Sequence, residues 1–211
     1  MANVNKIEQY NKGTVFPDSY EETYLATKHI SDIKLAIPND IFKKLKQKIE
    51  EKGLYFGDDS VLRNIIAGII KGNIILQGPP GTGKTTLAKI ICDVFEVAYT
   101  EATANSDWTT YDSIGGLQPS ANDEGHEVIE GKNGYVVSSI LKCCDLIVKN
   151  ENDNGTLQGN WLILDELNRC EIDKVFGDLF TALGSDASET ERVINLWYQK
   201  DENKKMVYIP N

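Results

Sequence analysis

Apolar residues recur every three or four positions over residues 40–52 and 59–71, which predicts two amphipathic helices. Asp40 stands at the start of the first helix and is of a type that commonly caps helix N-termini. Residues 1–36 are polar with scattered aromatic side chains and show no firm period. We therefore expect an N-terminal extension over residues 1–36 and a folded core over residues 37–211.

Short apolar runs without polar alternation follow, and such runs are typical of strands buried on both faces of a parallel sheet. Two of them span residues 73–77 and 161–164, and a third strand is expected near residues 97–102. Helical spacing of apolar residues separates them at residues 84–94 and 137–148. This alternation of strands and helices predicts an α/β fold with a parallel sheet.

The remaining patterns predict one more helix and two β-hairpins. Residues 171–183 carry an apolar stripe at helical spacing. Residues 127–137 are interpreted as two short strands around a turn at residues 131–134, and residues 193–209 as a second hairpin.

Residues 78–85 match the phosphate-binding pattern G-x-x-x-x-G-K-[ST] at every defined position, between a predicted strand and a predicted helix. Glycine lets successive backbone N–H groups curl around a phosphate, and the helix N-terminus adds partial positive charge there. Lys84 is expected to place its cation between the β- and γ-phosphates, and the Thr85 hydroxyl to bind Mg²⁺. The expected nucleotide-binding residues are Gly78, Pro79, Pro80, Gly81, Thr82, Gly83, Lys84, Thr85 and Thr86.

The predicted strand at residues 161–164 ends in two acids, Asp165 and Glu166. Paired with a phosphate loop, this pattern assigns Asp165 to the Mg²⁺ site together with Thr85. Glu166 is expected to orient and polarise the attacking water as the catalytic base.

Asn168 and Arg169 follow directly and are further catalytic candidates. Two interpretations of Arg169 stay open. It is a surface charge near Glu171 or Asp173, or it is a polar latch near the γ-phosphate or a contact to a neighbouring subunit.

Composition narrows the possible partners. The chain has 22 Lys and Arg residues against 32 Asp and Glu residues, which gives a net charge of −10 and disfavours direct nucleic-acid or membrane binding. The four cysteines lack the spacing of a zinc site and are expected to be free thiols. No signal sequence or apolar run of about 20 residues is recognised, so we expect a cytoplasmic protein.

The run from Asp165 to Arg169, Asp-Glu-Leu-Asn-Arg, together with the phosphate loop, resembles AAA+ P-loop NTPases of the MoxR and McrB-like, dynein-related branch. Residues 108–116 and 172–180 are also similar to segments of that branch. The resemblance implies a three-layer αβα fold with a parallel sheet of order 5-1-4-3-2 and two β-hairpin inserts. It also implies that residues 37–211 form a large subdomain that stops before the central strand with sensor 1, the arginine finger and the lid.

The resemblance implies an ATPase that uses Mg²⁺ in a homo-oligomeric ring, with a hexamer expected, to remodel a protein partner. Its alternatives are a GTP-dependent motor subunit of the McrB restriction type and a scaffold that binds nucleotide without hydrolysing it. The chain has only three arginines, Arg63, Arg169 and Arg192. Since phosphoryl transfer in such enzymes uses an arginine finger, we expect this chain alone to bind nucleotide and to turn it over very slowly.

Overall fold

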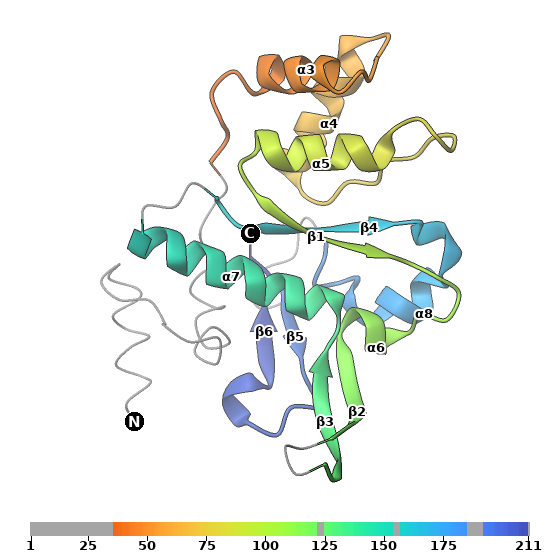
Figure 1. Cartoon of the computed structure of the whole chain (residues 1–211), viewed down its shortest axis with the longest axis vertical. Helices are drawn as coiled ribbons and strands as arrows, with labels where there is room; N and C mark the ends of the chain where they lie inside the picture. Colours follow the sequence, from red (N-terminus) through yellow and green to blue (C-terminus); the bar gives the residue numbers. More distant parts are fainter. Residues whose placement is uncertain (1–35, 122–124, 154–156, 185–191, 211) are drawn as a thin grey trace.

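A computed structural model describes residues 36–121, 125–153, 157–184 and 192–210. The N-terminal extension expected over residues 1–36 lies outside this described part except for its last residue. A small parallel sheet forms the middle of the molecule, with helices stacked on both of its faces (Figure 1). This is the α/β fold with a parallel sheet that the alternating pattern predicts, in the three layers that the family resemblance implies.

Three helices form one outer layer, and they are α3 (Ile41–Glu51), α4 (Asp59–Lys71) and α5 (Lys84–Val94). The Asp58 carboxylate caps α4 by accepting a hydrogen bond from the Ser60 N–H. Asp40 occupies the N-cap position of α3 but makes no side-chain cap there, in contrast to its expected role, because its backbone is left-handed at φ 55°. Capping residues ordinarily have extended backbone angles, which aim the side chain at the free N–H groups.

The central sheet pairs β1 (Ala98–Thr103) with β4 (Asn160–Asp165) in parallel, with Ala98 opposite Asn160 and Thr103 opposite Asp165. Successive side chains of β4 point to opposite faces. Trp161 and Ile163 pack with the layer of α3, α4 and α5, whereas Leu162 and Leu164 pack with the opposite layer. The sheet therefore separates two apolar cores.

Residues 73–77, which the apolar pattern predicts to be a buried strand, form no strand in the structure. Ile75 is 84 % exposed, and Leu76 alone of the run packs against the core beneath α5. A strand is stable only when a neighbour accepts its backbone hydrogen bonds. Within the described residues the central sheet contains β1 and β4, and neither pairs with residues 73–77.

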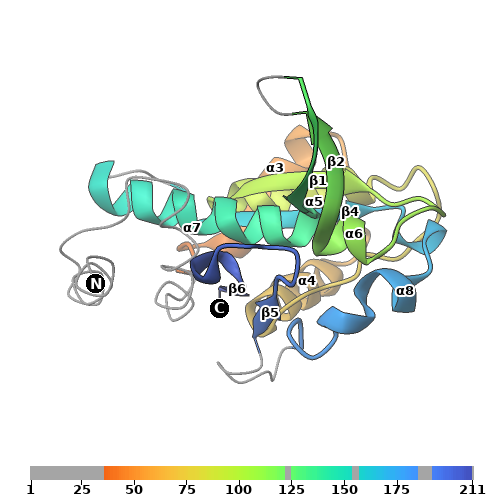
Figure 2. The ribbon, with the colours of Figure 1, turned by 90° about the horizontal axis from the view of Figure 1, so that it is seen from below.

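The second outer layer is built around the long helix α7 (Tyr135–Asp153), with α6 (Thr110–Ser113) packed against it and α8 (Ile172–Phe176) packed against α6 (Figure 2). The helix predicted over residues 171–183 is interrupted. Phe176 leaves helical geometry at φ −120°, and a 3₁₀ turn, η2 (Gly177–Leu179), follows. Glycine at position 177 explains the weak point, because it is a poor helix former.

Two antiparallel hairpins extend from this layer (Figure 1). The first pairs β2 (Gly115–Ala121) with β3 (Glu127–Asn133), and the second pairs β5 (Val193–Asn195) with β6 (Met206–Tyr208). The prediction of a turn at residues 131–134 is wrong, because Gly131 lies inside β3 opposite Leu117.

Gly131 has a packing role in place of a turn. A Cβ atom at this position would lie 2.9 Å from the Tyr198 ring and from the Tyr198 carbonyl oxygen. The Tyr198 hydroxyl lies 2.8 Å from the Ile114 carbonyl oxygen and 3.0 Å from Asn133 Oδ1. Tyr198, which follows β5, therefore joins the second hairpin to the base of the first.

The cysteines are free, and Cys92, Cys144 and Cys170 are buried while Cys143 is half-buried. Burial raises the pKa of the Cys92 thiol to about 12, because desolvation disfavours the thiolate. No helix in the described part of the chain is both long and apolar enough to span a bilayer.

Candidate functional site

The phosphate loop connects residues 73–77 to α5 and is exposed along most of its length. Lys84 is the first residue of α5, and its Nζ donates hydrogen bonds to the carbonyl oxygens of Gly78 (3.0 Å) and Pro79 (2.8 Å). The Thr82 hydroxyl also donates to the Pro79 carbonyl, at 2.9 Å. The ammonium group is therefore held inside the curve of the loop, where it can meet an anion.

Glycine is required in this loop by backbone angle and by space. Gly81 and Gly83 have φ values of 76° and 78°, which strongly favour glycine. A Cβ atom on Gly83 would lie 2.6 Å from Leu54 Cδ2. Leu54 thus supports the loop from the segment between α3 and α4, a contact that the sequence pattern does not indicate.

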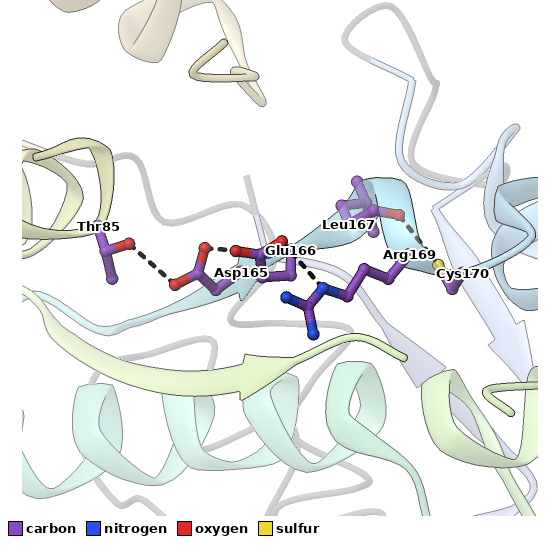
Figure 3. A network of polar contacts seen from close by, with 6 residues as sticks. All are labelled: Thr85, Asp165, Glu166, Leu167, Arg169 and Cys170. Carbon is purple, nitrogen blue, oxygen red and sulfur yellow. Dashed lines mark hydrogen bonds and ion pairs between the residues drawn. The ribbon is translucent and has the colours of Figure 1, made fainter. Parts of the chain in front are cut away.

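The expected metal ligands Thr85 and Asp165 meet in the structure. Thr85 Oγ1 donates a hydrogen bond of 2.9 Å to Asp165 Oδ2, across 80 residues of sequence. The first turn of α5 supplies the hydroxyl, and the carboxyl end of β4 supplies the carboxylate (Figure 3). The other oxygen of Asp165 accepts a hydrogen bond of 2.9 Å from the Glu166 backbone N–H.

Glu166 follows β4 in a left-handed conformation with φ 54°, which is uncommon for a residue other than glycine. The chain then turns through the 3₁₀ helix η1 (Leu167–Arg169), and the Arg169 N–H donates to the Glu166 carbonyl oxygen. Strained backbone of this kind is common at functional sites.

Arg169 Nε donates a hydrogen bond of 3.1 Å to Glu166 Oε2, and the two charged side chains form an ion pair (Figure 3). The sequence suggested Glu171 or Asp173 as surface partners, but the structure gives Arg169 the carboxylate of Glu166. Three residues of separation within a tight turn bring these two side chains together.

Asn168 and Thr86 lie at the edge of this arrangement. Both side chains are exposed, and neither makes a hydrogen bond to another described residue. The contacts therefore link Thr85, Asp165, Glu166 and Arg169 in one chain, while Lys84 lies within the loop beside it.

One polar pair near the site was missed by the sequence analysis. Lys89 on α5 forms an ion pair with Glu101 on β1, with 2.7 Å between Nζ and Oε2. The hydrogen bond to Glu101 raises the pKa of Lys89 above its ordinary value. The helical and strand periods place both residues on facing surfaces, but only the packing of α5 on the sheet pairs them.

The donor atoms fit a magnesium ion better than a soft metal. Mg²⁺ is commonly held by one or two carboxylates or hydroxyls together with substrate phosphates and water. Thr85 and Asp165 supply two hard oxygen ligands side by side. The described residues contain no group of three or more His, Cys, Asp or Glu side chains that could hold a metal unaided.

A phosphate loop at the start of α5, an acidic strand end beside it and helices on both sheet faces define a P-loop nucleotide-binding protein. The family is given by comparison with known sequences. The profile of the AAA domain (dynein-related subfamily) matches residues 73–205, and the chain belongs to this family. The chain is thus an AAA+ module of the McrB and MoxR-like branch that binds ATP or GTP.

Two relatives show how far the similarity extends. The type IV methyl-directed restriction enzyme EcoKMcrB subunit of Escherichia coli (strain K12) is 27 % identical over 146 residues, which cover 67 % of this chain and 28 % of that protein. An uncharacterized protein of Staphylococcus epidermidis (strain ATCC 12228 / FDA PCI 1200) is 28 % identical over 96 residues, which cover 46 % of this chain and 30 % of that protein. The alignments thus span less than a third of either relative.

Proposed function

We propose that this chain binds ATP with Mg²⁺ and hydrolyses it within a ring of subunits to remodel a protein partner. The observation that carries the proposal is the 2.9 Å hydrogen bond between Thr85 Oγ1 and Asp165 Oδ2, with Glu166 as the next residue. It brings the phosphate loop and the acidic strand end to one point. The phosphates would bind along residues 78–86, with Lys84 between the β- and γ-phosphates.

In the proposed reaction, a water oxygen attacks the γ-phosphorus while the bond from that phosphorus to the β–γ bridging oxygen breaks. The Glu166 carboxylate accepts the proton that the water loses, and the products are ADP and inorganic phosphate. Lys84 stabilises charge on the phosphate oxygens, and Asn168 helps to orient the water. A magnesium ion held by Thr85 and Asp165 would supply neutralisation of the phosphate charge when bound.

Catalysis is expected to need a ring of subunits, because each arginine in the described part of the chain either makes another contact or lies away from the phosphate loop. The Arg63 guanidinium stacks over the Phe42 ring at 4.2 Å, and Arg169 is paired with Glu166. Arg192 directly precedes β5, and β5 lies on the other side of the central sheet from α5 (Figure 1). We therefore propose that a neighbouring subunit or partner supplies the arginine finger, in an assembly for which a hexamer is the expected form, and that the isolated chain turns over slowly.

A second candidate is a GTP-dependent motor subunit of a restriction system. It is favoured by the similarity to the EcoKMcrB subunit of a type IV restriction enzyme. The net charge of −10 speaks against direct nucleic-acid binding by this chain, so a partner would contact DNA in that case. The choice of base separates the two candidates.

The proposal is tested by titrating Mg-ATP and Mg-GTP into the wild-type chain, Lys84→Ala and Glu166→Gln. Binding is measured by calorimetry, and hydrolysis by phosphate release. Lys84→Ala is expected to weaken binding by roughly tenfold or more, since it removes a charge-assisted contact to phosphate. Lys46→Ala is the matched control, because Lys46 on the surface of α3 forms an ion pair with Asp59 of α4.

Glu166→Gln is expected to bind nucleotide and to lose turnover. Equal affinity of wild type and Lys84→Ala would defeat the assignment of the phosphate site. Unchanged phosphate release by Glu166→Gln, in the presence of measurable wild-type activity, would remove Glu166 as the base. Tight binding without hydrolysis in any assembled state would favour the non-hydrolysing scaffold.

A further inference from the structure

The ion pair between Lys89 and Glu101 connects α5 to the central sheet. Lys89 Nζ lies 2.7 Å from Glu101 Oε2, and 38 % of the Lys89 side chain and 34 % of the Glu101 side chain are exposed. The same ammonium group lies 5.7 Å from the centroid of the Tyr99 ring, two positions before Glu101 on β1. Alternate residues of a strand share one face, so β1 presents both contacts to α5 from a single face.

A second polar contact between α5 and the sheet is the hydrogen bond between Thr85 and Asp165 at the phosphate loop. Thr85 and Lys89 are four residues apart on α5, which places them on one side of the helix with a rise of about 6 Å between them. Glu101 precedes by two positions Thr103, the residue of β1 opposite Asp165, which corresponds to about 6–7 Å along the strand. Because the two spacings agree, one helical turn of α5 makes both contacts at once.

Apolar packing holds α5 against the sheet but does not by itself define its position along the helix axis. The buried residues of α5 share a core with Trp161 and Ile163 of β4. Burial of apolar surface is non-directional, whereas a charge-assisted hydrogen bond has a defined length and direction. The pair of Lys89 and Glu101 therefore adds a fixed contact one helical turn from Thr85.

The pair adds this contact without adding net charge near the proposed metal site. The hydrogen bond to Glu101 raises the pKa of Lys89, and the negative charges of Glu101 and Asp165 raise it further. Lys89 therefore carries a positive charge within electrostatic reach of Asp165, and such a charge alone would oppose a cation there. The Glu101 carboxylate offsets it.

We propose that Lys89 and Glu101 are positioning residues that set the level of α5 on the sheet, and with it the spacing of the Thr85 hydroxyl and the Asp165 carboxylate as Mg²⁺ ligands. Mg²⁺ demands near-octahedral geometry at about 2.0–2.1 Å, whereas Ca²⁺ accepts flexible geometry at about 2.3–2.6 Å. A fixed ligand spacing therefore favours Mg²⁺ over Ca²⁺. This inference rests on the proposed function of the site and adds the contact that makes the site selective.

The test compares nucleotide affinity in Mg²⁺ and in Ca²⁺. The wild type, Lys89→Met, Glu101→Gln and the double variant are titrated by calorimetry with the non-hydrolysable β,γ-imido analogue of ATP in each metal. We expect each single variant to lower the ratio of the affinity in Mg²⁺ to that in Ca²⁺ by roughly two- to fivefold, the range for an exposed ion pair. The double variant should lose no more than either single variant, because one contact is removed in all three.

Two further variants separate positioning from general damage. Lys89→Arg should keep the wild-type ratio, since it restores a cation that reaches Glu101. Lys48→Met is the matched control for loss of an exposed ion pair on α5, because Lys48 joins Asp93 of α5 to α3 and not to the sheet. Its ratio should equal that of the wild type.

Three results would overturn the proposal. If the charges act only through space, loss of the Lys89 charge would tighten binding with both metals and loss of the Glu101 charge would weaken it with both. Equal losses in Mg²⁺ and Ca²⁺ would indicate a purely structural role. An unchanged ratio in Lys89→Met and Glu101→Gln would show that the pair does not set the ligand spacing.

The outcome is distinguishable from failure of the proposed function. If the wild type binds the analogue with Mg²⁺ in a Lys84-dependent manner but the ratio does not respond to the pair, only the positioning role is rejected. If the wild type binds the analogue with neither metal, both proposals are rejected.

Discussion

Glycines of the phosphate loop and glycines at the base of the β2–β3 hairpin differ in how much free space lies beside them. In the loop, a Cβ atom added to Gly81 would meet no atom within 4 Å, and one added to Gly78 would come no closer than 3.6 Å to Thr82; Gly83, where the loop joins α5, is the exception because Leu54 packs against it. At the hairpin, a Cβ atom on Gly115 would lie 2.2 Å from the Lys132 carbonyl oxygen, and one on Gly116 would lie 2.1 Å from the Tyr111 ring.

The difference separates space for a ligand from space already filled by the protein. Gly78 and Gly81 have open space beside them, where a phosphate is expected to bind, whereas the hairpin glycines are covered by the rings of Tyr111 and Tyr198. The same residue type thus belongs to a proposed binding surface in one region and to a tightly packed contact in the other. Substitutions in the two regions should consequently affect different measurements.

The largest effect is expected from Gly115→Ala. The change adds a methyl group against backbone atoms at a φ of 125°, so the free energy of unfolding should fall by about 2–5 kcal/mol. Urea unfolding measures the loss. Gly125→Ala is the matched control, because Gly125 has φ 80° and no atom within 4 Å of the added Cβ, and its cost should be only about 1 kcal/mol. Equal losses in the free energy of unfolding at the two positions would show that the backbone angle, and not packing, determines the cost of the added methyl group.

Tyr198→Phe should come next, with a loss of about 1–3 kcal/mol in the free energy of unfolding. The substitution removes the hydroxyl that lies against the buried Ile114 carbonyl and the half-buried Asn133 Oδ1, and so removes one polar partner from each of these two acceptors. Tyr111→Phe serves as control, because the Tyr111 hydroxyl bonds to no other described residue. A similar loss in both variants would argue against the hydroxyl as the joint between the hairpins.

Gly81→Ala should lower the free energy of unfolding by only about 1 kcal/mol, since the added methyl group enters open space at φ 76°. Its nucleotide affinity should nevertheless fall about tenfold, because the loop loses the curvature that directs N–H groups at phosphate. Calorimetry with Mg-ATP checks the affinity. A large stability loss with unchanged affinity would reverse the contrast between loop and hairpin.

The smallest effect at neutral pH is expected at Cys92, which lies in the packed part of α5, the helix that begins at the open loop. The folded thiol has a pKa of about 12 against an unperturbed 9.0, so it should stay protonated and unreactive toward a disulfide reagent at pH 8. Above pH 9 only the unfolded thiol ionises, so stability should fall as pH rises from about 9 toward 12. Fast labelling of Cys92 in the folded chain at pH 8 would contradict its burial.

The sequence predicts best what depends on neighbours along the chain. The loop from Gly78 to Thr85 and the acidic end of β4 are local patterns, and the structure places both at one edge of the sheet. The end of α8 and the hairpin register escaped prediction for different reasons. Gly177 follows a local break at Phe176 that apolar spacing does not register, while Gly131 is a strand residue because Tyr198, 67 positions later, packs against it.

The strand prediction for residues 73–77 illustrates a further limit. An apolar run indicates that a segment will be buried, but it does not show whether a neighbouring strand is present to accept the backbone hydrogen bonds of that segment. The Arg169 contact shows the reverse case. Its partner Glu166 is only three positions away, yet hydrophobic periodicity does not predict the left-handed backbone at Glu166 that brings the two side chains together.

The parallel register of β1 and β4 has a consequence for assembly of the site. A slip of one residue would exchange the two faces of β4, so that Trp161 and Ile163 would enter the core now filled by Leu162 and Leu164. The same slip would move Asp165 by one strand position, about 3.3 Å, away from Thr85. The packing of Trp161 and of the β4 leucines in the two cores therefore sets the distance between the Thr85 hydroxyl and the Asp165 carboxylate, which are the ligands of the proposed metal site at the edge of the sheet.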